Sequence, residues 1–285
     1  MSDALVIAGH ALKEAVRRRV LLVVALLTAV FLGLYALGAA NVFASLERER
    51  GSGFVPLDER ALAGGTLLGL AMFVALFLGV VLAIFLTLGA VRGDAERGLL
   101  QPLVVRPVGR TTLLVGRLLA ASAVCVPYVV SVFLIAALIT RWTGDFTPAS
   151  YVVPAAGLAL GVVTVVAISL LGSTALGTTA NGIAIFMVFG TGLAAGLLGQ
   201  IGDALDVGTL TTASTLISWV VPFEALYQNG LHALTSNVGG VAGVIVQLGP
   251  FGGARSMSAA IWPWAAAWSA AVLALAALAF RRRDL

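Results

Sequence analysis

Side chains that could perform catalysis or hold a metal are scarce in this sequence. The only two histidines, His10 and His232, are far apart in the chain, and Cys125 is the single cysteine. A metal site needs several such ligands held together, so we expect none here. The chain also lacks an H-E-x-x-H pair and a G-x-x-x-x-G-K-S/T loop, so it cannot hydrolyse ATP as P-loop proteins do. We therefore predict that the chain is not an enzyme.

The segment at residues 92–117 carries the strongest indication of function. Apolar Leu100 and Leu103 stand among charged residues there, and Arg106 and Arg110 follow them. This pattern suits a short helix that lies on the membrane and docks into a groove of a partner, with the arginines paired to acidic groups or anionic lipid. The alternative is a basic connector on the inner side of a membrane.

Three short motifs in this segment are typical of a known family. The pattern Glu-x-Gly-x-Leu, then Pro-x-x-Arg, then Gly-Lys/Arg occurs as Glu96–Leu100, Pro107–Arg110 and Gly116–Arg117. In these motifs the sequence resembles the type-2 ATP-binding-cassette (ABC) exporter permeases. Two positions depart from that family. Leu99 replaces a common threonine, and Pro102 would move the start of a coupling helix from residue 96 to residue 102.

The resemblance implies a mechanism that depends on partners. Residues 92–117 would form a cytoplasmic coupling loop, with a short coupling helix that contacts a separate ABC nucleotide-binding (ATPase) subunit. ATP and Mg would bind that subunit and this chain would hold no cofactor. A second permease copy or a paralogue would complete the pathway as a dimer. The coupling residues implied are Glu96, Gly98, Leu100, Leu103, Arg106, Pro107, Arg110, Gly116 and Arg117.

The composition predicts an integral membrane protein. Of the 285 residues, 60% are hydrophobic and 11% are charged, and the mean hydropathy is +1.06. Soluble domains carry about 25% charged residues, and disordered chains combine high charge with low hydrophobicity. The net charge of +4 lies at segment ends and forms no continuous basic face, so we expect no nucleic-acid partner.

Charge-free runs predict an all-α fold with six transmembrane helices in a single permease domain, residues 1–285. A span needs roughly 20 consecutive apolar residues. We do not expect a β-barrel, because the runs do not alternate polar and apolar residues. The expected spans are residues 20–40, 65–90, 118–139, 151–171, 182–201 and 261–280.

The distribution of basic residues predicts the orientation. Twelve of the 17 Lys and Arg residues fall on the side that holds both termini and residues 92–117, and five fall on the other side. Cytoplasmic loops carry the excess of positive charge, so we expect both termini in the cytoplasm and the protein in a prokaryotic plasma (inner) membrane.

The N-terminal segment, residues 1–19, is predicted to be an interfacial helix. Its apolar residues recur at helical spacing, and Lys13, Arg17 and Arg18 occupy the polar face, where they would meet membrane lipid. The alternative is a plain charged anchor for the first span.

Residues 202–260 are predicted to form an outer loop with a short re-entrant helical hairpin before the last span. Pro222 suits the first turn of a helix, Glu224 lies near its positive end, and Tyr227 follows one turn later. The alternative for residues 207–230 is an extra span that would place the C-terminus outside. The closing Arg281–Arg283 triplet argues against that span.

The sequence therefore predicts the membrane-spanning permease subunit of an ABC exporter. No expected span core contains Asp, Glu, Lys, Arg or His, which disfavours an ion-coupled secondary transporter and suits amphipathic or lipid-like cargo. A non-transporting scaffold that recruits a cytoplasmic partner remains the main alternative. Small residues are expected to allow close helix packing, and these are Gly157, Gly161, Ser169, Gly190, Gly192 and Gly196.

Overall fold

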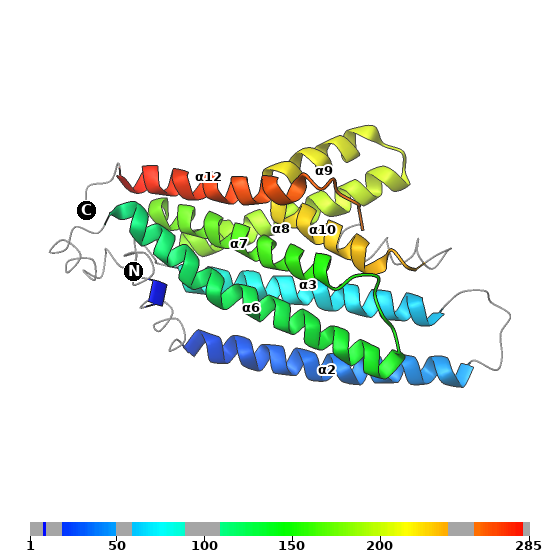
Figure 1. The fold of residues 1–285 in the computed structure, drawn as a ribbon. Coiled ribbons are helices and arrows are strands. Elements are labelled where there is room, and N and C mark those ends of the chain that lie inside the picture. Colours follow the sequence, from blue (N-terminus) through cyan, green and yellow to red (C-terminus); the bar gives the residue numbers. More distant parts are fainter. Residues whose placement is uncertain (1–7, 10–18, 50–58, 89–108, 239–253, 282–285) are drawn as a thin grey trace.

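The computed structural model describes residues 8–9, 19–49, 59–88, 109–238 and 254–281, and these contain helices and connecting segments but no strand. Figure 1 shows the arrangement of the helices. Their bounds are α2 Arg19–Glu49, α3 Glu59–Thr87, α6 Arg110–Gly144, α7 Val152–Ala175, α8 Thr178–Ala204, α9 Gly208–Val220, α10 Pro222–Thr235 and α12 Ile261–Arg281.

Six of these helices, α2, α3, α6, α7, α8 and α12, are long and apolar enough to cross a membrane. The predicted all-helical fold with six spans is thereby confirmed. Most of these helices are longer than the charge-free runs, because backbone hydrogen bonding continues past the apolar core into polar ends. For example, α2 continues to Glu49 and α6 to Gly144. In contrast, α3 ends at Thr87, three residues before the predicted end at residue 90.

The long helices lie side by side along one direction, with α7 among the others (Figure 1). α7 contacts α3, α6, α8, α10 and α12, whereas α2 lies at one side of the bundle against α6 and α3. The start of α2, the start of α6 and the end of α12 lie at the same end of the bundle. Because the number of spans is even, the chain enters and leaves the bundle on the same side, which agrees with the positions of the start of α2 and the end of α12.

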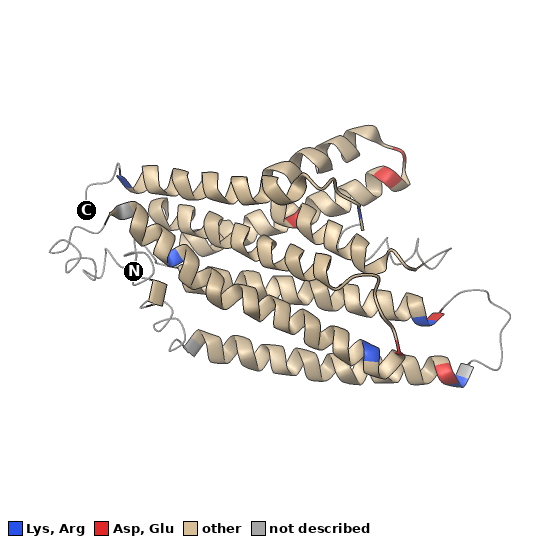
Figure 2. Ribbon diagram, in the orientation of Figure 1, with Lys and Arg blue, Asp and Glu red and all other residues tan. Residues whose placement is uncertain are grey.

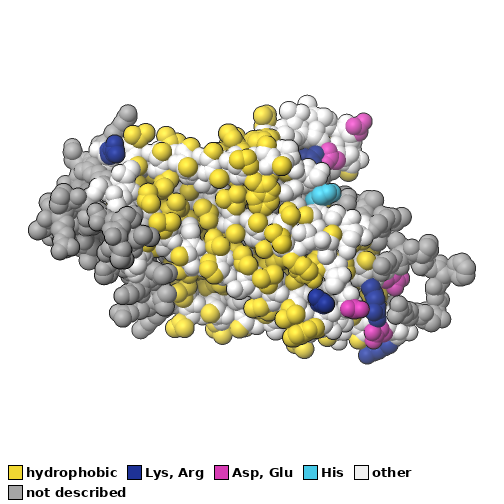
Figure 3. Space-filling view, viewed as in Figure 1, with side chains coloured by type: hydrophobic (Ala, Val, Ile, Leu, Met, Phe, Trp, Pro, Cys, Tyr) yellow, Lys and Arg dark blue, Asp and Glu magenta, His cyan; other side chains and the backbone are white. Residues whose placement is uncertain are grey.

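The surface of the bundle is apolar around its middle. Figure 3 shows hydrophobic side chains across the centre of one face, and Figure 2 shows charged side chains toward the helix ends. On α2, Leu22 is 72% exposed and Leu34 is 65% exposed, although both are large apolar residues. Such a surface is stable in lipid, where exposed leucine costs nothing, and is unfavourable in water.

Hydroxyl groups join the long helices inside the bundle. Each pair forms a hydrogen bond between side chains on two different helices, which satisfies polar groups that lipid cannot. The pairs are Tyr35–Thr140 at 2.5 Å and Thr28–Tyr128 at 2.5 Å between α2 and α6, Thr87–Ser169 at 2.6 Å between α3 and α7, and Thr164–Ser269 at 3.2 Å between α7 and α12.

Candidate functional site

Most of the predicted coupling residues lie outside the described residues. This applies to Glu96, Gly98, Leu100, Leu103, Arg106 and Pro107, and also to Lys13, Arg17 and Arg18 of the predicted interfacial helix. Of the remaining coupling residues, Arg110 begins α6, Gly116 is buried in its second turn, and Arg117 is partly exposed. The coupling and interfacial roles therefore stay predictions.

Of the predicted outer loop at residues 202–260, the structure describes 202–238 and 254–260, and the first part holds the segment predicted as a hairpin. The hairpin consists of α9 and α10, which have 13 and 14 residues and meet at Val221. Both are shorter than the roughly 20 residues that a span needs, and neither is among the six helices that are long and apolar enough to cross a membrane. Pro222 occupies the first turn of α10, where its missing N–H leaves no hydrogen bond unmade.

α10 is packed into the bundle instead of covering its end. It contacts α3, α7, α8, α9 and α12. Phe223, Glu224 and Tyr227 are 1%, 1% and 2% exposed. The Phe223 ring stacks on Phe189 of α8 at 5.3 Å between centroids, and Tyr227 meets the edge of Phe73 of α3 at 6.4 Å. The three residues that the sequence placed in the hairpin are therefore all buried in α10, namely Pro222, Glu224 and Tyr227.

A row of glycines on α8 lets the hairpin approach closely. A Cβ at Gly192 would meet the Phe223 ring at 2.6 Å, and one at Gly196 would overlap the Glu224 carboxyl group. At Gly199 it would lie 2.5 Å from Ser214 Oγ. These glycines recur every three or four residues and therefore share one face of α8. The predicted packing role of small residues agrees with this face, whereas Gly190 faces open space.

Glu224 is the charged residue at the centre of this contact. Gln228 Nε2 donates a hydrogen bond to Glu224 Oε1 at 2.5 Å, and Ser218 Oγ of α9 donates to Oε2 at 3.2 Å. Among the described residues, no basic side chain forms an ion pair with Glu224. Desolvation by burial raises the pKa of the Glu224 carboxyl, and the two hydrogen bonds and the charge of Arg255 lower it by less.

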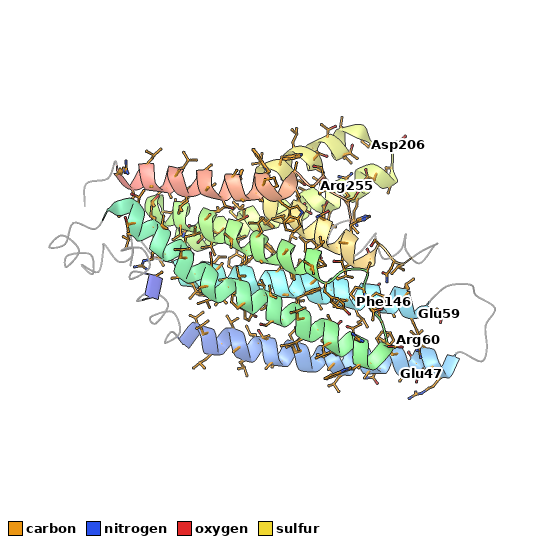
Figure 4. All side chains as sticks on the ribbon, in the orientation of Figure 1. Glu47, Glu59, Arg60, Phe146, Asp206 and Arg255 are labelled. Atoms are coloured by element: carbon orange, nitrogen blue, oxygen red, sulfur yellow. The ribbon has the colours of Figure 1, made fainter. Side chains whose placement is uncertain are left out.

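A cavity of about 430 Å³ lies between the hairpin and the segment that enters α12. Its wall includes Ser218 and Trp219 of α9, His232 of α10, and Arg255 and Met257 before α12. Figure 4 shows Arg255 close to the start of α12. Two further contacts join these elements: Trp264 Nε1 of α12 donates to the Trp219 carbonyl at 3.0 Å, and the backbone N–H of Met257 donates to Asn229 Oδ1 at 3.1 Å.

Arg255 is held by a carboxylate on α8. Its Nε and Nη2 atoms donate to Asp203 Oδ2 at 2.9 and 2.5 Å.

Three buried polar atoms of the hairpin have no hydrogen-bond partner among the described residues, and these are Gln228 Oε1, Ser214 Oγ and His232 Nδ1. Buried polar atoms are normally paired, and of these three residues His232 is the one that lines the cavity.

Sequence reasoning missed several members of this site. The i, i+4 spacing of Glu224 and Gln228 on a predicted helix is a signal that could have found their contact. Asp203 and Arg255 are 52 residues apart, and no local pattern connects them. The charge-free spans also did not indicate an acidic group inside the bundle, because Glu224 belongs to the hairpin and not to any of the six spans.

Comparison with known proteins supports one family. A family model described as ABC-2 family transporter protein matches residues 5–285, which is nearly the whole chain. No curated protein matches the chain. The match agrees with the six apolar helices and with the motifs at residues 92–117. The chain therefore belongs to the ABC-2 family of transporter membrane proteins.

Proposed function

We propose that the chain is the permease subunit of an ABC exporter, working as a dimer and powered by ATP hydrolysis in a separate nucleotide-binding subunit. The family match carries this proposal, since ABC-2 permeases are membrane transport subunits that generally work with an ATPase subunit. Residues 92–117 would transmit the movement of that subunit to α3 and α6, which they connect. The second permease would be another copy or a paralogue.

The arrangement of the helices supports a coupling contact in this place. α3 ends and α6 begins at the end of the bundle that also holds the start of α2 and the end of α12. Arg19, Arg110 and Arg281 are terminal residues of these helices at that end. The opposite end carries charges of both signs, among them Glu47, Glu59 and Arg60 (Figure 4). The positive-inside rule then favours a cytoplasmic position for residues 92–117, where an ATPase subunit can reach them.

The test compares how strongly two double variants of the permease, each lacking two charged side chains, stimulate the ATPase subunit. The permease is reconstituted with the P-loop ATPase that co-purifies with it, and ATP hydrolysis is measured with and without the permease. We expect the double variant Glu96→Ala, Arg110→Ala to lose stimulation by about tenfold or more, because truncating charged contacts of an interface costs about 2 kcal/mol or more. The matched control is Arg48→Ala, Glu59→Ala at the opposite end, which should keep full stimulation.

Two results would contradict this proposal in different ways. Full stimulation by the Glu96, Arg110 double variant would remove the coupling role from this segment. A wild-type permease that binds the ATPase but never changes its rate, with or without cargo lipids, would favour the scaffold instead of the exporter.

A further inference from the structure

We propose that the cavity beside the hairpin binds an anionic amphiphile, namely a carboxylate or phosphate group attached to an apolar body. The inference deepens the proposed function and rests on it in one respect, because a ligand of an exporter permease in this position would be cargo. The ligand chemistry itself follows from the residues that line the cavity.

The cavity has the size and the mixed wall of a small-molecule site. Its volume of about 430 Å³ lies within the range of about 300–1,000 Å³ that is usual for such sites. Trp219, Met257 and Ile261 supply apolar surface, whereas Arg255 and Ser256 supply polar groups. A molecule with an apolar body and one polar head group matches both parts of this wall.

Arg255 gives the wall its charge. It is the only Asp, Glu, Lys or Arg residue among the described residues that line the cavity. Its side chain is 25% exposed, so a ligand can reach the guanidinium although most of the side chain is shielded from water. An ammonium head group would meet this positive charge with no carboxylate beside it in the wall. The charge of the wall therefore favours an anion.

The Arg255 guanidinium is held in place and still has hydrogen-bond donors to offer. Nε and Nη2 both donate to one oxygen of Asp203, and Asp203 does not line the cavity. Nη1 lies beside Gly199 of α8, where a Cβ would come within 3.0 Å. A guanidinium has five N–H donors, so three have no partner among the described residues. An arginine fixed in this way is preorganised for a second anion, and the exposed Ser256 next to it adds a hydroxyl donor.

The buried carboxyl of Glu224 does not cancel the charge of Arg255. Glu224 does not line the cavity and contacts its wall through Ser218, which donates to it at 3.2 Å. Burial raises the pKa of this carboxyl to about 7, although hydrogen bonds from Gln228 and Ser218 and the charge of Arg255 lower it by less. At about pH 6 the group is therefore mostly protonated and neutral, whereas a carboxylate ligand with an ordinary pKa of about 4 is ionised.

The experiment compares three ligands that share one skeleton and differ in the head group. They are 4-(4-bromophenyl)butyrate, 4-(4-bromophenyl)butan-1-ol and 4-(4-bromophenyl)butylamine, whose bromine quenches tryptophan fluorescence only at short range. The full chain in phosphatidylcholine nanodiscs, without any ATPase, is titrated with each ligand at about pH 6. Trp219 lines the cavity, and the difference between wild type and Trp219→Phe separates its quenching from that of the other tryptophans by ligand dissolved in the lipid. We expect saturable quenching of Trp219 by the carboxylate, with an affinity about tenfold higher than that of the alcohol, and the weakest binding by the amine.

Three variants locate the head group. Arg255→Gln removes the charge and should weaken binding of the carboxylate by about tenfold while leaving the alcohol unchanged. Asp203→Asn removes the charged partner of Arg255 but keeps the positive charge, so it should maintain or raise the affinity for the carboxylate. A purely structural role of Arg255 predicts the opposite, because both variants break the same ion pair, and Asp203→Asn preserves the test if Arg255→Gln does not fold. Arg60→Gln removes an arginine from the exposed ion pair with Glu47 and should change nothing.

The proposal is overturned if the amine binds more tightly than the carboxylate, if the three ligands bind equally, if Arg255→Gln leaves the affinity for the carboxylate unchanged, or if Asp203→Asn weakens it. Acetate and inorganic phosphate carry the charge without the apolar body and should compete only weakly. Equally strong competition by either would show a site for small anions and refute the amphiphile. Because no ATPase is present, these results do not depend on coupling. Carboxylate binding by a permease that never stimulates its ATPase would refute the exporter and keep the site, whereas stimulation without carboxylate binding would refute the site alone.

Discussion

Replacing Gly196 with alanine tests whether close contact with α8 holds the hairpin in the bundle. A methyl group at this position would overlap Glu224 Oε1 and lie 3.0 Å from Gln228 Nε2. Neither atom can move away freely, because the two side chains are hydrogen-bonded to each other and are both buried. The substitution should therefore push α10 away from α8 and break the contact that buries Glu224.

The expected loss of stability follows from two opposing effects. Adding a methyl group to a packed core costs about 1–3 kcal/mol, and the overlap with a fixed carboxyl group places Gly196→Ala near the upper limit. Alanine in place of glycine within a helix returns about 1 kcal/mol. The free energy of unfolding should therefore fall by about 2 kcal/mol.

Gly190 provides the matched control on the same helix. A Cβ at Gly190 would meet no atom within 4 Å, so Gly190→Ala should keep or raise stability by up to about 1 kcal/mol. Unfolding of each variant is followed by titration with sodium dodecyl sulfate in mixed micelles, monitored by tryptophan fluorescence. The two variants should differ by about 3 kcal/mol. Equal stability would show that the hairpin does not depend on this glycine face.

Two further predictions concern the bundle and its orientation. Thr87→Val removes the 2.6 Å hydrogen bond to Ser169 and should cost about 0.6 kcal/mol in the same unfolding assay, with a double-mutant cycle against Ser169→Ala as the check; additive effects would mean that the two hydroxyls do not interact. A cysteine at Glu47 should react with an impermeant maleimide in intact cells, and one at Arg97 only after permeabilisation. The native Cys125 is fully buried and gives no background, and the reverse labelling would invert the proposed orientation.

The helices that build the bundle could be predicted from the sequence because hydrophobicity is a local property. A run without charged residues must either be buried or lie in lipid, whatever the rest of the chain does. The helix ends were less predictable. α6 continues past its apolar run to Gly144 and ends at Asp145, whose backbone adopts the left-handed conformation. The apolar run does not indicate this position.

The candidate site was predictable only in part. Pro222 and Glu224 mark the first turn of α10 through well-known preferences at a helix start. Their burial was not predictable in the same way, because a short helix rich in apolar residues can lie on a membrane or inside a bundle with the same sequence. The glycines of α8 indicate close packing, but their spacing does not say which element packs there.

The membrane class, the six apolar helices, the start of α10 and the family motifs can all be read from the sequence, because each depends on residues that are adjacent or nearly adjacent in the chain. Two contacts appear only in the folded chain: Ser218 of α9 donates to Glu224 of α10, and Arg255 before α12 donates to Asp203 of α8. These contacts join separate elements, and their geometry depends on how each helix is rotated and tilted against its neighbours. That rotation is set by side-chain packing across the whole bundle, which no local pattern encodes.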